Sequence, residues 1–254
     1  FITSTVSGIG RVVGGSGDDF VTLSSDAQGS SVRGNGGDDP LIGGSGSDDA
    51  IFCVTFDGYD IAIRNGTLTI TDVIAADGND GRDTVSAIER LWFDDQAVMV
   101  TQSDSVPLIR FRDQQAGHHD YAMPDTAAHT VLGTDSAHTR EGVAFRAYTS
   151  ATAAPDTLPV HSFVHAATGT QIMTLAAAEI TQLQESSAYQ DQGIQFYALA
   201  AAATDTVAVV RYRDLHTGTH FFSANVAEQA VIAADRPDLQ LEGIAFYAHG
   251  ADWL

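Results

Sequence analysis

Residues 14–22 read Gly-Gly-Ser-Gly-Asp-Asp-Phe-Val-Thr, residues 34–42 read Gly-Asn-Gly-Gly-Asp-Asp-Pro-Leu-Ile, and residues 43–51 read Gly-Gly-Ser-Gly-Ser-Asp-Asp-Ala-Ile. The three segments share one nine-residue pattern, with glycines first, an aspartate at the sixth position and an apolar residue at the eighth, or the ninth in the third segment. Glycine tolerates positive φ and lets the backbone approach an ion closely, while the last three residues suit a short strand. The stretch therefore predicts tight turns alternating with short strands.

This pattern, G-G-x-G-x-D-x-U-x with U a large apolar residue, resembles the repeats-in-toxin (haemolysin-type) nonapeptide. The resemblance implies a calcium-binding β-roll of type I-secreted bacterial proteins, in which each nonapeptide makes half a turn and calcium lies between stacked turns. The alternative is a flexible acidic linker. A linker, however, would not place Val21, Val32 and Leu41 at one repeating position.

The resemblance also assigns calcium ligands, which are backbone carbonyls of the turns and the aspartate at the sixth position. Such hard oxygen atoms are the ligands that Ca²⁺ prefers. The residues expected to form the calcium sites are Gly14, Gly15, Gly17, Asp19, Gly34, Gly36, Asp39, Gly43, Gly44, Gly46 and Asp48.

The register predicts two unequal sides. Residues 25–33 fit as a degenerate repeat with Ser30 at the aspartate position. Repeats two apart stack on one side, so we predict one good calcium site between the turns of Asp19 and Asp39. On the other side Ser30 faces Asp48, and that site should be weaker or empty because serine lacks a carboxylate.

The residues around the repeats are expected to be β structure. Residues 1–13 predict one entry strand, and residues 51–105 predict a β cap that begins with a strand at Ile51–Phe56. Two further runs, Tyr59–Arg64 and Thr67–Asp72, flank Asn65-Gly66, which is a strong two-residue hairpin signal.

The segment 83–95 resembles the one that closes β-rolls in type I-secreted proteins. The acidic loop before it carries Asp77, Asp80 and Asp83. These carboxylates either hold a further calcium ion or form a solvated polar loop.

Composition narrows the class of protein. The 254 residues carry a formal net charge of −21, with 33 acidic residues and 12 basic ones, all of them arginine. Such acidity argues against a nucleic-acid or anionic-membrane partner, and no apolar run reaches the ~20 residues that span a bilayer. A single cysteine, Cys53, allows no internal disulfide and is expected to be a small buried apolar residue. We therefore expect calcium, in place of disulfides, to stabilise the fold of an exported protein.

The front of the chain shows no signal peptide, and Phe1 is not a start methionine. Because repeat-like β structure begins at once, we expect a piece of a longer, secreted, extracellular or cell-surface protein.

The second half has an internal triplication with a period near 50 residues, over about 107–150, 157–200 and 206–250. Its units resemble a repeat of uncharacterised function found in secreted bacterial proteins. Each unit predicts strand, Thr-Gly turn, strand, short helix, loop and strand. The helix is clearest at Val226–Ala234, where Asn225 and Glu228 suggest a capping box. It is expected at Ala176–Leu183 in the second unit and is doubtful in the first.

The predicted fold is therefore mainly β: a short parallel β-roll with a β cap over 1–105, then a pseudo-threefold domain over 106–254. The repeated ends of the three units predict a shared aromatic core of Phe145, Phe196 and Phe246.

Chemistry in the triplicate domain is weakly indicated. His118, His119 and His220 suggest a metal site, a structural His–Glu hydrogen bond or a ligand contact, and metal ligation is the least favoured because zinc needs three or four convergent ligands. The six possible ligand-binding residues are Arg211, Tyr212, His220, Phe222, Glu228 and Glu242. Their rings and charges suit a sugar platform, but the rings suit a core equally.

Three functional hypotheses remain open. The first is a non-catalytic, calcium-binding region of a secreted or surface protein, of the adhesin or surface-layer type, whose C-terminal domain binds a glycan or a protein. The second is the calcium-dependent secretion and folding region of a secreted hydrolase whose catalytic domain precedes residue 1. The third makes the triplicate domain an enzyme, although Gly-x-Ser-x-Gly, Walker and His-Glu-x-x-His motifs are missing from the sequence.

Overall fold

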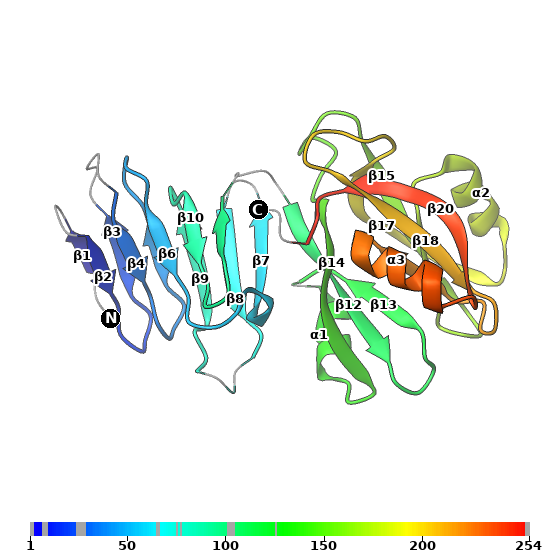
Figure 1. Ribbon diagram of the computed structural model, residues 1–254, viewed down its shortest axis with the longest axis horizontal. Helices are drawn as coiled ribbons and strands as arrows, with labels where there is room; N and C mark the ends of the chain where they lie inside the picture. Colours follow the sequence, from blue (N-terminus) through cyan, green and yellow to red (C-terminus); the bar gives the residue numbers. More distant parts are fainter. Residues whose placement is uncertain are drawn as a thin grey trace. The chain divides into compact units, whose positions relative to one another are not determined.

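The computed structural model describes residues 3–6, 10–23, 29–64, 67–74, 76, 78–100, 105–124 and 126–251. The fold is mainly β, as predicted, and the chain divides into two compact units at residues 103–104. Each unit has its own hydrophobic core and is described by itself (Figure 1). No helix among the described residues is both long enough and apolar enough to cross a membrane.

The first unit is built from two sheets between which the chain alternates. One sheet has the order β1-β3-β5-β9-β8-β7 and the other β11-β10-β6-β4-β2. The alternating strands are β1 Thr3–Val6, β2 Arg11–Val13, β3 Phe20–Leu23, β4 Ser31–Arg33, β5 Pro40–Ile42, β6 Asp49–Ile51, β9 Arg82–Ser86 and β10 Arg90–Trp92. Neighbours among these strands are parallel, so the chain winds as a β-roll.

The predicted stacking of alternate repeats is confirmed. Val21 pairs with Leu41 in one sheet, and Val32 pairs with Ala50 in the other. These eighth-position residues are fully buried, because successive side chains of a strand point to opposite faces and the central residue of each short strand points inward. The core between the sheets therefore follows directly from the nonapeptide pattern.

Two predictions about the flanks of the repeats were wrong. The predicted single entry strand is two strands, β1 and β2, which lie in different sheets and add another turn. The strand expected over Ile51–Phe56 ends at Ile51, and a 3₁₀ turn, η1, follows at Phe56–Gly58. Phe52 and Phe56 are still buried, but Phe52 follows the strand and Phe56 begins the 3₁₀ turn, so core packing overrides the strand-like pattern of the sequence.

The hairpin is confirmed. Strands β7 (Tyr59–Arg64) and β8 (Thr67–Asp72) pair from Tyr59 with Asp72 to Arg64 with Thr67, while residues 65–66 lie outside the described ones. The hairpin joins the roll through β8 and β9, which are antiparallel, and β11 (Ala97–Met99) joins the other sheet through β10.

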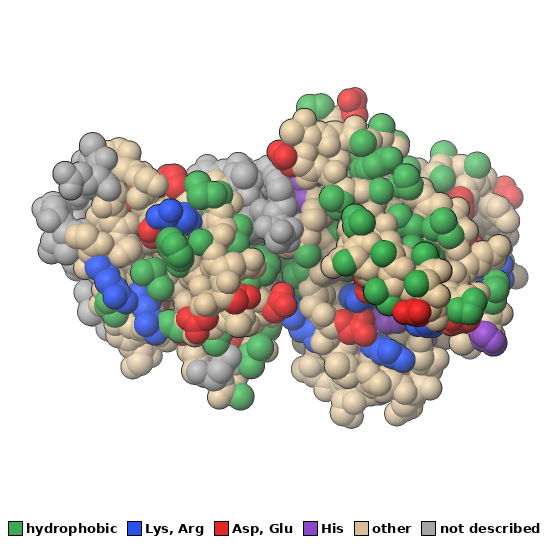
Figure 2. Space-filling model, viewed as in Figure 1, with side chains coloured by type: hydrophobic (Ala, Val, Ile, Leu, Met, Phe, Trp, Pro, Cys, Tyr) green, Lys and Arg blue, Asp and Glu red, His purple; other side chains and the backbone are tan. Residues whose placement is uncertain are grey.

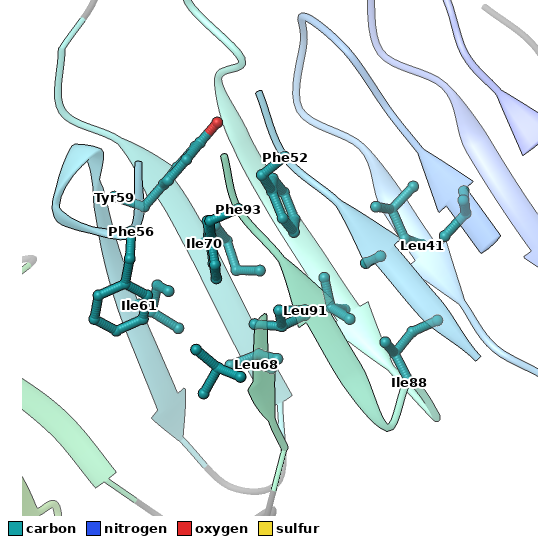
Figure 3. Close-up of a cluster of buried hydrophobic side chains, with 14 of the residues drawn as sticks. Leu41, Phe52, Phe56, Tyr59, Ile61, Leu68, Ile70, Ile88, Leu91 and Phe93 are labelled. Carbon is teal, nitrogen blue, oxygen red and sulfur yellow. The ribbon is translucent and has the colours of Figure 1, made fainter. Parts of the chain in front are cut away.

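An aromatic cluster closes this end of the core (Figure 3). The rings of Phe52, Tyr59 and Phe56 all contact Phe93, with centroids 5.2–5.5 Å apart. Such ring pairs add stabilisation beyond the area that they bury. The cap is therefore part of the same hydrophobic core as the repeats.

The second unit repeats one motif three times: two strands, a helix and a long strand. The elements are β12 Ser105–Asp113, β13 His119–Ala122, α1 Ala127–Thr134 and β14 His138–Tyr148; β15 Thr157–His165, β16 Gln171–Thr174, α2 Ala177–Glu185 and β17 Tyr189–Leu199; and β18 Val207–Asp214, β19 His220–Ser223, α3 Val226–Asp235 and β20 Leu239–Ala248. The doubt about the first helix was misplaced, because Thr126 caps α1 by accepting from the His129 N–H.

The shared aromatic core is confirmed. The rings of Phe145, Phe196 and Phe246 meet edge to face, with centroids 5.4–5.7 Å apart, and all three are buried. Around them the last strands of the units touch in a closed circuit, through Tyr148 with Tyr197, Leu199 with Tyr247 and Arg146 with His249. This circuit gives the unit its pseudo-threefold character.

Candidate functional site

The sixth-position aspartates of the roll form a buried ladder on one side. The Asp19 N–H donates to Asp39 Oδ1 over 2.7 Å, and the Asp39 N–H donates to Asp83 Oδ1 over 2.9 Å. All three carboxylates are at most 2% exposed. The structure thus brings together the two predicted aspartates and adds a third rung.

The opposite side has a ladder of its own. The Ser30 N–H donates to Asp48 Oδ1 over 2.7 Å, and the Asp48 N–H donates to Glu89 Oε2 over 2.8 Å. Ser30 does occupy the aspartate position, as the register predicted. Glu89 supplies a carboxylate on the far side of Asp48, and sequence reasoning missed it.

The third rung belongs to a nonapeptide that the sequence analysis overlooked. Residues 78–86 read Gly-Asn-Asp-Gly-Arg-Asp-Thr-Val-Ser, which parallels Gly-Asn-Gly-Gly-Asp-Asp-Pro-Leu-Ile at 34–42. Their strands pair in register, with Leu41 beside Val85. The fixed spacing of glycine, aspartate and valine was the available signal, but the insertion of residues 52–77 separates this repeat from the others.

Close packing of the turns explains their glycines. A Cβ added to Gly14 would lie 2.5 Å from the Gly34 carbonyl oxygen and 2.7 Å from Asp19 Oδ2, and a Cβ on Gly34 would collide with Asp39 Oδ2. A Cβ on Gly43 would collide with the Ala87 carbonyl oxygen. In contrast, nothing lies within 4 Å of a Cβ on Gly17. The turns therefore crowd oxygen atoms against particular glycines.

The buried carboxylates carry an electrostatic cost. Burial raises the pKa of Asp39, and burial together with the nearby Asp39 charge raises the pKa of Asp83 to about 8. Asp39 Oδ2 is buried and has no hydrogen-bond partner among the residues that the structure describes. A buried anion of this kind is stable only when a cation or donors compensate it, so the site fits a cation.

A cation here would draw most of its ligands from the backbone. Among the described residues, no group of three or more His, Cys, Asp or Glu side chains is placed to hold a metal ion. Turn carbonyls are hard oxygen donors like carboxylates, and calcium accepts both. Asp77, which was considered for another calcium site, lies outside the described residues, and Asp80 instead accepts from the Tyr59 hydroxyl over 2.5 Å.

In the second unit, an arginine links each of two neighbouring repeat pairs. Arg110, on β12 of the first repeat, donates to Glu141 over 2.7 Å and makes a bidentate pair with Glu228 of α3, at 2.9 and 3.2 Å. The Arg110 guanidinium also lies 4.8 Å from the centroid of Phe221. Burial opposes ionisation of Glu141, but His119 and Arg110 lower its pKa to about 2.

The same arrangement joins the third repeat to the second. Arg211 pairs with Glu179 of α2 at 3.0 Å and with Glu242 at 2.7 Å. Burial lowers the pKa of His220, whose Nε2 lies 3.5 Å from Glu242 Oε2. We call these two arrangements the arginine clasps.

The third junction, between the second and first repeats, has no arginine clasp among the described residues. Ser162 stands where the other repeats have arginine, and Gln171 donates to its hydroxyl over 2.9 Å. Amides cap the edge of β13 instead, since Gln171 Oε1 accepts from the Tyr121 N–H and Gln195 Nε2 donates to the Tyr121 carbonyl, both over 2.9 Å. The junction is therefore held by neutral groups.

This neutral junction leaves an open groove of about 610 Å³ between α1 and the strands of the second repeat. Val131 and Ile194 on its walls are 63% and 50% exposed. The residues that line it are Asp120, Tyr121, Met123, Thr126, Ala127, Ala128, Val131, Leu132, Ser162, Val164, Gln171, Gln192, Ile194 and Gln195.

The predicted ligand-binding residues are not all available. Phe222 is fully buried in the shared core and Tyr212 is only 6% exposed, because it packs with Phe221 and Ile232. Neither ring can therefore serve as a sugar platform, and the core interpretation is the right one for both. The remaining four predicted residues all belong to the arginine clasps or contact them.

The expected His–Glu contacts exist but do not involve the helix. His119 and His220 approach Glu141 and Glu242, which are on the long strands, while the helix carboxylates pair with arginine. Sequence reasoning missed these clasps because Arg110 and Glu228 are 118 residues apart.

A family model described as "Domain of unknown function (DUF5648)" matches residues 79–199 and again residues 107–249. The chain belongs to this family. The two matches overlap over residues 107–199, and the second match covers all three repeats of the second unit.

No curated protein matches the sequence. Among solved structures, the extracellular lipase LipA from Serratia marcescens is similar at 18% identity and a TM-score of 0.16. The match covers 35% of this chain and 16% of the lipase chain, so the chain corresponds to a small part of that protein's length. A likeness this loose shows no shared fold.

Proposed function

We propose that the first unit is a calcium-binding β-roll of a secreted or cell-surface protein, of the repeats-in-toxin type. The observation that carries this proposal is the ladder of Asp19, Asp39 and Asp83, which is buried and in which no described group hydrogen-bonds to Asp39 Oδ2. The glycine-lined turns that crowd oxygen atoms around it support the same assignment.

The ladder supports a proposal for which residues would hold calcium. One site lies between the turns 14–19 and 34–39, and a second lies between 34–39 and 78–83, with Asp39 common to both. The side that begins at Ser30 remains the weaker one, although Glu89 gives its last turn a carboxylate. Calcium supplies positive charge that compensates these buried carboxylates.

The chain's own residues would make folding depend on calcium. Without a cation, Asp39 and Asp83 must either stay protonated or bury negative charge, and both conditions oppose folding at neutral pH. Export fits this dependence, since extracellular sites of this kind bind at roughly 10⁻⁴–10⁻³ M. The roll would stay unfolded where calcium is scarce and would fold outside the cell.

Circular dichroism and hydrogen exchange of the full chain, measured with calcium and then with EGTA, test this proposal. We expect EGTA to remove β signal and hydrogen-exchange protection from residues 29–100 but not from residues 105–250. Unchanged protection of residues 29–100 after chelation would refute it.

For the second unit, we propose a non-catalytic binding role for a glycan or protein partner, as in an adhesin or surface-layer protein. The open groove between α1 and the second repeat supports this role, because its size suits a ligand and its walls carry the exposed apolar side chains of Val131 and Ile194. The role of a secretion and folding region for a hydrolase is the alternative, and a catalytic domain before residue 1 would select it.

A substitution within the groove tests the binding role. Ile194→Glu places a charge on the groove wall, whereas Ile244→Glu places it at the equivalent, also exposed position of the third repeat. On a glycan array in calcium buffer, only the Ile194 variant should lose the signals of the unmodified chain. Equal binding by both variants, or no binding by the unmodified chain, would count against a glycan in this groove.

A further inference from the structure

The outward face of one roll sheet combines arginines with exposed apolar side chains. In the sheet β11-β10-β6-β4-β2 the middle residue of each strand points toward the core, and the flanking residues point outward. In-register pairing keeps the outward residues on one face. They are Arg11, Val13, Ser31, Arg33, Asp49, Ile51, Arg90, Trp92, Ala97 and Met99.

The charge of this face differs from that of the chain. It carries three of the five arginines of residues 1–105 and a single acid, Asp49. Asp49 is engaged by Arg90, through two bonds of 2.9 and 2.8 Å. No hydrogen bond or ion pair joins the side chain of Arg11 or Arg33 to another described residue, and Arg33 Nε is buried without such a partner. In a chain with 33 acids, two guanidinium groups on one face that pair with no described side chain favour an anionic partner.

An aromatic ring stands beside these charges. Trp92 is 41% exposed, and the Arg90 guanidinium lies 4.9 Å from its ring centroid. Because Asp49 holds Arg90, the stacked guanidinium supports one side of the indole. Figure 2 shows arginine side chains next to apolar ones on the visible surface of this unit.

We propose that this face binds a linear polysaccharide that carries carboxylates. A sugar ring stacks on the exposed indole of Trp92, and carboxylates of the same polymer pair with Arg33 and Arg11. Strands β10 and β4 are two positions apart, so the ring and Arg33 are separated by about 10 Å at the usual strand spacing. That is the scale of two sugar residues.

The position of these residues on the face of the sheet favours a polysaccharide over an acidic peptide. Peptides are usually bound at a sheet edge or in a groove, whereas Trp92 and Arg33 stand on the middle of a sheet face. This inference goes beyond the calcium function proposed above. It requires a folded roll, but it does not depend on the ligand of the second unit.

Titration calorimetry of the full chain with a hyaluronan octasaccharide, in 1 mM calcium, tests the inference. Arg33→Gln and Arg11→Gln should each weaken binding about tenfold, the usual effect of losing a charge-assisted hydrogen bond. Trp92→Ala should weaken it by about threefold to tenfold. Arg112→Gln makes the same change of net charge at an exposed position of β12 in the second unit and should have no effect. Circular dichroism confirms that each variant is folded.

Three outcomes would overturn the inference. The first is equal binding of the octasaccharide's carboxyl methyl ester, which keeps the sugar but removes the charge. The second is an equal loss of affinity in the Arg112 variant, which would indicate a non-specific charge effect. The third is equal or tighter binding of oligoglutamate, which would assign the face to an acidic protein. Persistent hydrogen-exchange protection of the roll throughout would separate any of these from a failure of calcium-dependent folding.

Discussion

Asp83→Asn is expected to change the stability of the roll in opposite directions with and without calcium. Asn keeps an oxygen that can accept from the Asp39 N–H, as Asp83 Oδ1 does over 2.9 Å, but it removes the ionisable group. With calcium, the variant loses a ligand charge and should be less stable than the unmodified chain. With EGTA at neutral pH, it should be more stable.

The magnitude without calcium follows from the pKa of Asp83. Burial raises this pKa from 3.8 to about 8 in the folded roll. Because the folded pKa lies above the unfolded one, the stabilising contribution is complete below pH ~4 and is lost as the pH rises toward 8. One pKa unit corresponds to about 1.4 kcal/mol, so the loss between pH 5 and pH 7.5 is at most ~3 kcal/mol. Burial also raises the pKa of Asp39, which adds a loss of the same sign.

Hydrogen exchange of peptides from residues 29–100, corrected for intrinsic rates, measures this difference in EGTA at pH 5 and pH 7.5. Protection of the unmodified roll should fall between the two pH values, and protection of the Asp83→Asn roll should fall less. Two results would refute the reasoning: protection of the unmodified roll that is independent of pH, or an asparagine variant that is less protected than the unmodified chain in EGTA as well as in calcium.

Three further perturbations have defined outcomes. Gly34→Ala should abolish calcium-dependent folding measured by circular dichroism, because its Cβ would collide with Asp39 Oδ2. Glu228→Gln should lower the free energy of unfolding of the second unit by about 1–3 kcal/mol, because it weakens a charge-assisted pair with Arg110. A double-mutant cycle with Arg110→Met should show that the two residues are energetically coupled. Phe246→Ala should cost about 3–5 kcal/mol in calorimetric unfolding of the second unit, because it leaves a cavity in the shared core.

Matched variants serve as controls for each of these. Gly17→Ala should bind calcium normally, since nothing lies within 4 Å of the added Cβ. Glu179→Gln should reproduce the effect of the Glu228 variant, because it breaks the equivalent clasp, whereas the exposed Glu185→Gln should be silent. Phe145→Ala should cost as much as the Phe246 change. If the second unit tolerated the loss of one core ring but not of the other, the result would contradict a single shared core.

Local pattern was sufficient to predict much of the fold. Nine-residue spacing predicts which strands stack, because the roll repeats its register every two nonapeptides, and Asn65-Gly66 predicts the hairpin ends at Arg64 and Thr67. The helix at Val226–Asp235 was predicted from Asn225, whose side chain accepts from the Ala227 and Glu228 N–H groups. The second half of the capping box did not form, because Glu228 pairs with Arg110 and Ser223 instead.

Features that depend on distant residues were not predictable in this way. The arginine clasps join repeats through charges far apart in sequence. At the junction of Ser162, neutral amide hydrogen bonds replace these ion pairs, although the backbone motif is the same. Likewise, Glu89 completes a ladder from within a segment that has no glycine-rich turn. In each case tertiary proximity determines the partner, and neither residue propensity nor sequence periodicity contains that information.

The insertion of residues 52–77 has a consequence for how such coils evolve. The chain leaves the roll after β6, forms the hairpin β7–β8, and resumes winding at residues 78–86 with Leu41 and Val85 still in register. A coil whose turns are held by neighbours in space does not need them to be contiguous in the gene. Extra segments can therefore be accommodated between half-turns, and the number of uninterrupted repeats sets only a lower bound on the length of a roll.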